Sequence, residues 1–140
     1  MMTTKALDVA PNALIGALAK ELKANPIIKP PAWINAVKTG SHNERVTEQE
    51  DFWYFRCASI LRTMFVNGTP VGVMRLRTKY GGRTKHTVHR EHHRQAGGKV
   101  IRLAIQQLEK AGFLKKEKVG RSISATGKKL VEKAAKDGAA

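Results

Sequence analysis

Apolar residues recur at helical spacing in several long stretches of the chain, and this pattern predicts a mainly helical protein. The first stretch begins at Pro11, where a first helical turn tolerates proline, and it ends near Ala24. The second, residues 51–66, is apolar on most of its sides, so we expect the rest of the chain to pack around it. Further amphipathic helices are predicted at residues 99–111 and from Thr126 onward.

Shorter segments connect these helices. Residues 31–35 and 71–77 each predict a short helix, the second with Leu76 facing inward and its arginines facing outward. Residues 84–98 show no hydrophobic period and predict a basic loop, and ordered loops of that length tend to be functional. Residues 1–10 are small and polar enough to predict a loosely held start.

The end of the chain, residues 99–137, has the element order of a winged-helix module. Gly112 suits the end of one helix, strands are predicted at 113–118 and 122–125, and Thr126 suits the N-cap of the last helix. The fold class that we expect is mainly α, in a single domain of residues 1–140. It would hold a winged-helix-like core of about five helices, with a short β-hairpin wing near residues 113–125.

Composition narrows the class of protein. A chain of 140 residues with 41% hydrophobic residues is long enough to bury a core. Its single cysteine, Cys57, excludes an internal disulfide and fits the reducing cytoplasm. No apolar run approaches the roughly 20 residues of a membrane span, and the N-terminus lacks a signal-peptide pattern. We therefore expect a cytoplasmic protein.

The net charge indicates a polyanionic partner. The formal charge is +15, and such a field attracts nucleic acid most commonly and anionic membranes second. Residues 51–104 hold 11 Lys and Arg against only Asp51 and Glu91. A surface that is only solvated usually mixes both signs, so this imbalance favours nucleic-acid binding over simple solubility.

The histidines of the basic loop raise the question of a metal. His86, His89, His92 and His93 are loosely spaced, no cysteine is near them, and the surrounding arginines would repel a cation. Histidine interleaved with arginine fits contacts with bases or phosphates better. We therefore predict neither a metal nor another cofactor.

Several motifs in one order make the chain recognisable. They are Pro31-Ala32-Trp33, Val37-Lys38-Thr39-Gly40, Trp53-Tyr54-Phe55-Arg56, Ala58-Ser59-Ile60-Leu61-Arg62, Val71-Gly72, Leu76-Arg77-Thr78, Tyr80-Gly81-Gly82-Arg83 and the ending from Leu108 to Thr126. From about Pro30 to Gly127 the chain resembles the archaeal and eukaryotic ribosomal protein family S19e (eS19). It departs from the family at Val46, often proline, at Asn43, often lysine, and at the His92-His93 pair, usually histidine followed by an aromatic residue.

The resemblance implies a place in the head of the small ribosomal subunit and a part in small-subunit maturation. It also implies contacts with the rRNA 3′ domain and with neighbouring head proteins, and no membrane or small-molecule partner. Arg56 and Arg62 flank the apolar surface of their predicted helix with few acids nearby, so a phosphate is a credible partner for both. The predicted RNA-binding residues are Lys38, Arg56, Arg62, Arg75, Arg77, Lys79, Arg83, Lys85, Arg90, Arg94, Lys99, Arg102 and Arg121.

Two other function classes deserve comparison. In a winged-helix DNA regulator, Lys99, Arg102 and Gln106 would enter the major groove and Arg121 would lie on the wing. Most of the charge, however, precedes that module, which does not suit a simple groove reader. The sequence shows no paired carboxylates, nucleophile triad or phosphate-loop motif, so we do not expect an enzyme.

Overall fold

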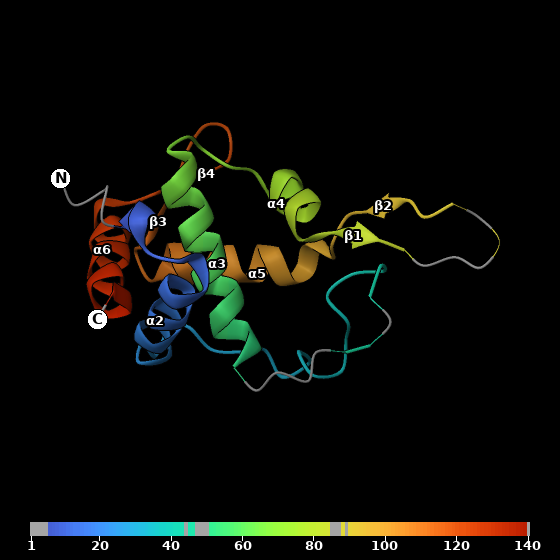
Figure 1. Ribbon diagram of the computed structural model, residues 1–140, viewed down its shortest axis with the longest axis horizontal. Coiled ribbons are helices and arrows are strands. Elements are labelled where there is room, and N and C mark those ends of the chain that lie inside the picture. Colours follow the sequence, from blue (N-terminus) through green and yellow to red (C-terminus); the bar gives the residue numbers. More distant parts are fainter. Residues whose placement is uncertain (1–5, 44, 47–50, 85–87, 89, 140) are drawn as a thin grey trace.

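The computed structural model describes residues 6–43, 45–46, 51–84, 88 and 90–139, and the described chain is mainly helical (Figure 1). Its helices include α2 (Pro11–Lys23), α3 (Phe52–Asn67), α4 (Val73–Tyr80), α5 (Gly98–Lys110) and α6 (Ala125–Ala139). Its strands are β1 (Gly82–Arg83), β2 (His93–Arg94), β3 (Leu114–Lys116) and β4 (Arg121–Ile123). The predicted fold class, mainly α with a winged-helix-like hairpin, is confirmed.

Helix α3 lies at the centre of the fold, in contact with α2, α5, α6 and β4 (Figure 1). Trp53, Cys57 and Leu61 along this helix are buried, as the apolar pattern of residues 51–66 predicts. The helix ends at Gly68, which adopts the left-handed conformation and donates its N–H to the Met64 carbonyl at 3.2 Å. Helices α2 and α6 pack on each other and on α3, and together they close one side of the core.

The wing is an antiparallel hairpin in which Leu114 pairs with Ile123 and Lys116 pairs with Arg121. Gly120 turns the chain with φ of +83°. Arg121 also exchanges two backbone hydrogen bonds with Val71, at 2.8 and 3.0 Å. The wing is thereby fixed to the segment that leads into α4.

Both wing strands are shorter than predicted, and the cap of α6 differs from the prediction. The helix begins at Ala125, one residue before Thr126. Ser124 Oγ accepts the Gly127 N–H at 3.2 Å and donates to the Gly112 carbonyl at 2.6 Å. Ser124 is therefore the residue that caps α6, because its hydroxyl oxygen accepts a backbone N–H of the first turn. Its bond to Gly112 also joins the start of α6 to the end of α5.

The segment predicted as a basic loop contains regular structure at its base. Arg83 pairs with His93 and Gly82 with Arg94, forming the two-stranded ribbon β1–β2. Figure 1 shows this ribbon extending away from the helical body. Alternation of apolar and polar residues does not reveal the ribbon, because both strands are only two residues long and mostly exposed.

Two predicted short helices also need adjustment. Residues 31–35 form turns, in which the N–H of Ile34 and the N–H of Ala36 each bond a carbonyl three residues earlier. The helix predicted at 71–77 begins later and runs further, as α4. At the N-terminus, where a loosely held start is predicted, Ala6 is buried in the core. Among the described residues, no helix combines the length and the apolar character needed to cross a membrane.

Candidate nucleic-acid interface

The contact between α3 and α4 is built around an arginine and two aromatic rings. Arg56 Cζ lies 4.1 Å from the centroid of the Tyr80 ring and 5.0 Å from that of the Phe52 ring. The Ser59 and Tyr80 hydroxyl oxygens are 2.6 Å apart and share a hydrogen bond. Burial lowers the pKa of Arg56 and raises the pKa of Tyr80. Ring faces, which attract cations, are thus the described partners of the Arg56 charge.

Nearly two turns further along α3, a second arginine lies near a lysine of α4. Lys79 Nζ, from α4, donates to Thr63 Oγ1, and the Thr63 hydroxyl donates to the Ser59 carbonyl at 2.8 Å. Burial and the nearby charge of Arg62 lower the pKa of Lys79. Arg62 Nε is buried without a hydrogen-bond partner. Two cations therefore lie close together in a partly buried place.

Helix α4 is also tied to the segment that enters α5. Arg77 Nε donates to the Ala96 carbonyl at 2.9 Å, and the Ala96 N–H donates to the Arg77 carbonyl at the same distance. Arg75, on the outer side of α4, is exposed. Arg77 therefore joins α4 to the base of the ribbon, while the Arg75 side chain lies in water.

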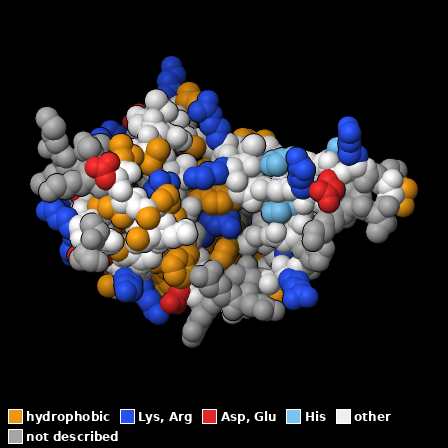
Figure 2. Space-filling model, in the orientation of Figure 1, with side chains coloured by type: hydrophobic (Ala, Val, Ile, Leu, Met, Phe, Trp, Pro, Cys, Tyr) orange, Lys and Arg blue, Asp and Glu red, His pale blue; other side chains and the backbone are white. Residues whose placement is uncertain are grey.

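The ribbon and the segment that joins its two strands carry exposed cations. Arg83, Arg90 and Arg94 are exposed, and Lys85 lies outside the described residues. Figure 2 shows the ribbon as a narrow arm bearing basic and histidine side chains with a carboxylate among them. Glu91 is the only acid between Phe52 and Leu108, so the field around the arm is strongly positive.

The Lys38 loop, predicted to lie at the border of this surface, packs against the base of the ribbon. Gly40 bridges to Ala96, and the Thr39 carbonyl accepts the Gly97 N–H at 2.8 Å. The His42 imidazole lies so close to Gly40 that an added Cβ there would meet it at 2.6 Å. The bridge to Ala96 and the hydrogen bond to Gly97 hold the loop, with its exposed Lys38, beside the ribbon.

The first turn of α5 completes the region. Lys99 Nζ lies 4.7 Å from the centroid of the Trp33 ring. Arg102 is exposed and folds back over Gly98, where an added Cβ would meet its Nη1 atom at 2.8 Å. We call the basic side chains of this region the basic surface, all of them exposed except the half-buried Arg77: Lys38, Arg75, Arg77, Lys79, Arg83, Arg90, Arg94, Lys99 and Arg102.

Arg121, the predicted contact on the wing, has a different environment. Its Nε lies 3.2 Å from Glu109 Oε2, and its Nη1 donates to the Gly120 carbonyl at 3.3 Å. The ion pair is about two-thirds buried on both sides, with side-chain exposures of 29% and 32%. Arg121 therefore has an internal carboxylate partner, whereas no described ion pair includes a member of the basic surface.

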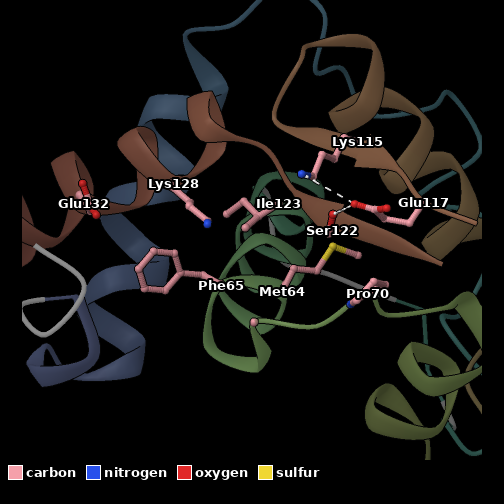
Figure 3. Close-up of a pocket in the computed structure, with 10 residues that line it drawn as sticks. Met64, Phe65, Pro70, Lys115, Glu117, Ser122, Ile123, Lys128 and Glu132 are labelled. Carbon is pink, nitrogen blue, oxygen red and sulfur yellow. Dashed lines mark hydrogen bonds and ion pairs between the residues drawn. The ribbon is translucent and has the colours of Figure 1, made fainter. Parts of the chain in front are cut away.

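A cavity of about 360 Å³ lies on the side of the wing, between the end of α3 and the start of α6 (Figure 3). Its floor is apolar and includes Met64, Phe65 and Ile123. Glu117, at its rim, already accepts a 2.9 Å hydrogen bond from Ser122 and lies 3.7 Å from Lys115. The described lining supplies no pair of free carboxylates and no nucleophile beside a base, so it does not indicate a catalytic site.

The loop histidines do not form a metal site in the described chain. His86 and His89 lie outside the described residues, and His92 and His93 are exposed. Among the residues that are described, no three His, Cys, Asp or Glu side chains gather closely enough to hold a metal ion.

Sequence reasoning missed the residues that support the basic side chains. Ser59, Thr63 and Tyr80 set the α3–α4 contact, and Thr39 links the Lys38 loop to α5. Tyr80 could have been identified from the sequence, because a large ring directly before Gly81-Gly82 needs a packing surface. The hydroxyl residues gave no such signal, because Ser and Thr are common on helices and in loops.

Comparison with known proteins identifies the family of this chain. The family model for ribosomal protein S19e matches residues 5–139. Small ribosomal subunit protein eS19 of Aeropyrum pernix is 44% identical, over 94% of this chain and 88% of its own length. The eS19 protein of Haloarcula marismortui is 42% identical, over 93% and 88%, and eS19B of Schizosaccharomyces pombe is 38% identical, over 91% and 90%. The chain therefore belongs to the S19e family of small-subunit ribosomal proteins, which are structural constituents of the ribosome and not enzymes.

Proposed function

We propose that the chain is a ribosome-associated, cytoplasmic constituent of the small-subunit head that binds rRNA of the 3′ domain and supports small-subunit maturation and translation. The observation that carries the RNA-binding part is the basic surface, whose cations have no ion-pair partner among the described residues. The motifs shared with the S19e family support the head location, the contacts with neighbouring head proteins and the role in maturation.

The proposed binding mode is recognition of folded RNA by its shape. An A-form major groove is closed to side chains, so the cations meet phosphates and sugar edges instead of reading bases. The projecting ribbon, with Arg83 and Arg94, and the segment between its strands, with Arg90, reach between RNA segments. Helix α4 and the first turn of α5 lie against the adjoining backbone. Arg56 and Arg62 contribute from α3, and Arg121 contributes from the wing.

The experiment is a salt titration of binding to an rRNA fragment from the 3′ domain. Each phosphate contact adds about 0.7–0.9 to the slope of log affinity against log salt concentration. The variant Arg83→Gln/Arg94→Gln should reduce that slope by the contribution of nearly two phosphate contacts. Lys129→Gln/Lys136→Gln, which removes the same charge from exposed positions of α6, is the matched control and should leave the slope almost unchanged. Affinity for rRNA that does not change with salt would contradict the proposal.

Location in the particle requires a second measurement. Small subunits assembled with and without the protein are probed chemically along the whole rRNA. The proposal predicts that the added protections fall in the 3′ domain, whereas protections confined to another domain would refute the head location. A binding assay with duplex DNA of the same length as the rRNA fragment tests the alternative function. A winged-helix DNA regulator would bind the duplex as a dimer and prefer one sequence.

A further inference from the structure

Strand β4 has an unpaired backbone edge beside the cavity of the wing. Arg121 directs its N–H and its carbonyl away from β3 and bonds Val71 with them, at 3.0 and 2.8 Å. Ser124 directs its N–H the other way, to the Phe113 carbonyl at 3.0 Å. Because these directions alternate along a strand, the N–H and the carbonyl of Ile123 face the same side as those of Arg121. In the described chain, no hydrogen bond reaches either group of Ile123 on that side.

The segment that pairs with Arg121 does not continue beside Ile123. Val71 and Arg121 form an isolated bridge, and the residues before Val71 lead back to Gly68 at the end of α3. The cavity of about 360 Å³ lies between Ile123 and this helix end (Figure 3). A strand paired with β4 would lie about 4.7–4.9 Å from it. The open edge therefore faces a cavity that an added strand can enter.

The cavity combines an apolar floor with one cation that has no described acid partner. Met64, Phe65 and Ile123 form the floor, and the volume is within the roughly 300–1,000 Å³ of ligand pockets. Figure 3 shows Lys128 reaching from α6, with its ammonium group between Phe65 and Ile123. Lys128 belongs to none of the ion pairs among the described residues. Glu117, on the rim, is already engaged within the wing.

Charge around the cavity favours an acidic occupant. Glu132, the other acid of the lining, lies one turn after Lys128 on α6 and forms no described ion pair with it. The wing and the first turns of α6 carry exposed cations: Lys115, Lys116, Lys118, Lys128 and Lys129. A second copy of the chain does not suit this place, because each copy has a formal charge of +15 and the copies repel each other.

The open edge also selects the kind of backbone. Ile123 offers one donor and one acceptor, and an extended polypeptide supplies the matching acceptor and donor at strand spacing. A phosphodiester linkage carries acceptors alone, so RNA would leave the Ile123 carbonyl unpaired. The aliphatic and aromatic floor favours apolar side chains in the same way. A protein segment therefore fits the edge, the floor and the cation together.

We propose that β4 and this cavity form a docking groove for an extended, acidic segment of a partner protein, which adds to the wing as a strand. The segment accepts the Ile123 N–H and donates to the Ile123 carbonyl. Its alternate apolar side chains enter the floor, and an acidic side chain meets Lys128. No member of the basic surface lines the cavity, so the groove is separate from the proposed RNA binding and does not depend on it.

The first test is an NMR titration of the full-length protein with a short synthetic peptide in which valine and glutamate alternate. Binding should shift the Ile123 N–H resonance and slow its exchange with water, whereas the Ser122 N–H, which faces β3, should keep its exchange rate. The same peptide with a methylated backbone nitrogen at its central residues lacks the donor and should not bind. Absence of binding, or binding that leaves Ile123 exchange unchanged, would overturn the proposal.

The cation is tested by charge reversal on neighbouring positions of α6. Lys128→Glu should weaken peptide binding by about tenfold or more, because the acid of the peptide then meets another acid. Lys129→Glu is the matched control, because it makes the same charge change at an exposed position outside the lining, and it should bind nearly as the wild type does. Equal losses in the two variants would mean that net charge alone attracts the peptide, and would refute the groove.

Reconstituted small subunits test the occupant in the particle. A photo-crosslinking amino acid in place of Lys115, at the rim of the cavity, reports what lies beside it. Crosslinks to a protein segment that holds acidic and apolar residues would support the proposal. Crosslinks to rRNA alone, or none, would overturn it and leave the proposed RNA binding unaffected.

Discussion

The indole Nε1 of Trp53 donates a 2.8 Å hydrogen bond to Oε1 of Gln107, and this bond joins α3 to α5 at the edge of the core. The same amide reaches a third segment: Gln107 Nε2 donates to the Lys29 carbonyl at 2.8 Å, and Oε1 also accepts the Lys29 N–H at 3.2 Å. One side chain thus connects three parts of the chain that are far apart in the sequence.

Replacing Gln107 with alanine should destabilise the protein by about 1–3 kcal/mol, because the indole N–H of the buried Trp53 loses its acceptor. Urea unfolding followed by Trp fluorescence measures the change. Gln106→Ala, at the exposed neighbouring position, is the control and should alter stability by less than about 0.5 kcal/mol. Equal effects of the two substitutions would contradict the role of Gln107.

The helical part of the fold could be predicted because burial there follows a helical period. Trp53, Cys57 and Leu61 are buried, as the apolar pattern of residues 51–66 predicts, and Gln106 on α5 is exposed. The role of Gln107 could not be predicted, because its partners come from an irregular segment and a distant helix and leave no local pattern. The residue that caps α6 could not be predicted either, because Ser124 and Thr126 are both suitable and only the folded chain shows that Ser124 makes the bond.

The charge count locates the basic surface but not the environment of each cation. Arg56 and Arg62 look equivalent in the sequence, as arginines that flank one apolar helix. The structure separates them, since Arg56 faces the Phe52 ring of α3 and the Tyr80 ring of α4, whereas Arg62 lies near Lys79. That difference depends on how α4 packs on α3. Hydrophobic periodicity reports which side of α4 is buried but not which atoms it meets.

The hydrogen bond between Ser59 and Tyr80 should be measurable as a coupling free energy. Ser59→Ala and Tyr80→Phe each remove one hydroxyl, and each should cost about 1 kcal/mol. Because the two hydroxyls bond each other, the double variant should cost less than the sum of the single variants, by about 0.5–1.5 kcal/mol. Denaturant unfolding of the four proteins gives this coupling. Additive costs would show that the bond does not stabilise the α3–α4 contact.

Alanine substitutions at two glycines with left-handed backbone test how firmly the wing is attached to the Val71 segment. Alanine at Gly112, φ +89°, meets nothing within 4 Å, so only the backbone conformation costs, about 1–2 kcal/mol. Alanine at Gly120, φ +83°, also places its Cβ 2.8 Å from the Val71 backbone carbon. Gly120→Ala should therefore destabilise the protein more than Gly112→Ala, as measured by urea unfolding. Equal costs would mean that the wing moves freely away from Val71.

The buried thiol of Cys57 should make the protein less stable in alkali. Burial raises the pKa of this thiol from 9.0 to about 12, so from pH 9.0 upward the unfolded chain loses a proton that the folded chain keeps. The stability that the protonated thiol contributes is present below pH 9.0 and is lost progressively toward pH 12. The loss approaches about 1.4 kcal/mol per pH unit for one group. Urea unfolding of the wild type and of Cys57→Ala across this range isolates the thiol, since Tyr80, whose pKa is also raised, titrates in both. The free-energy difference between the two proteins should shrink as pH rises, and parallel curves would refute the assignment.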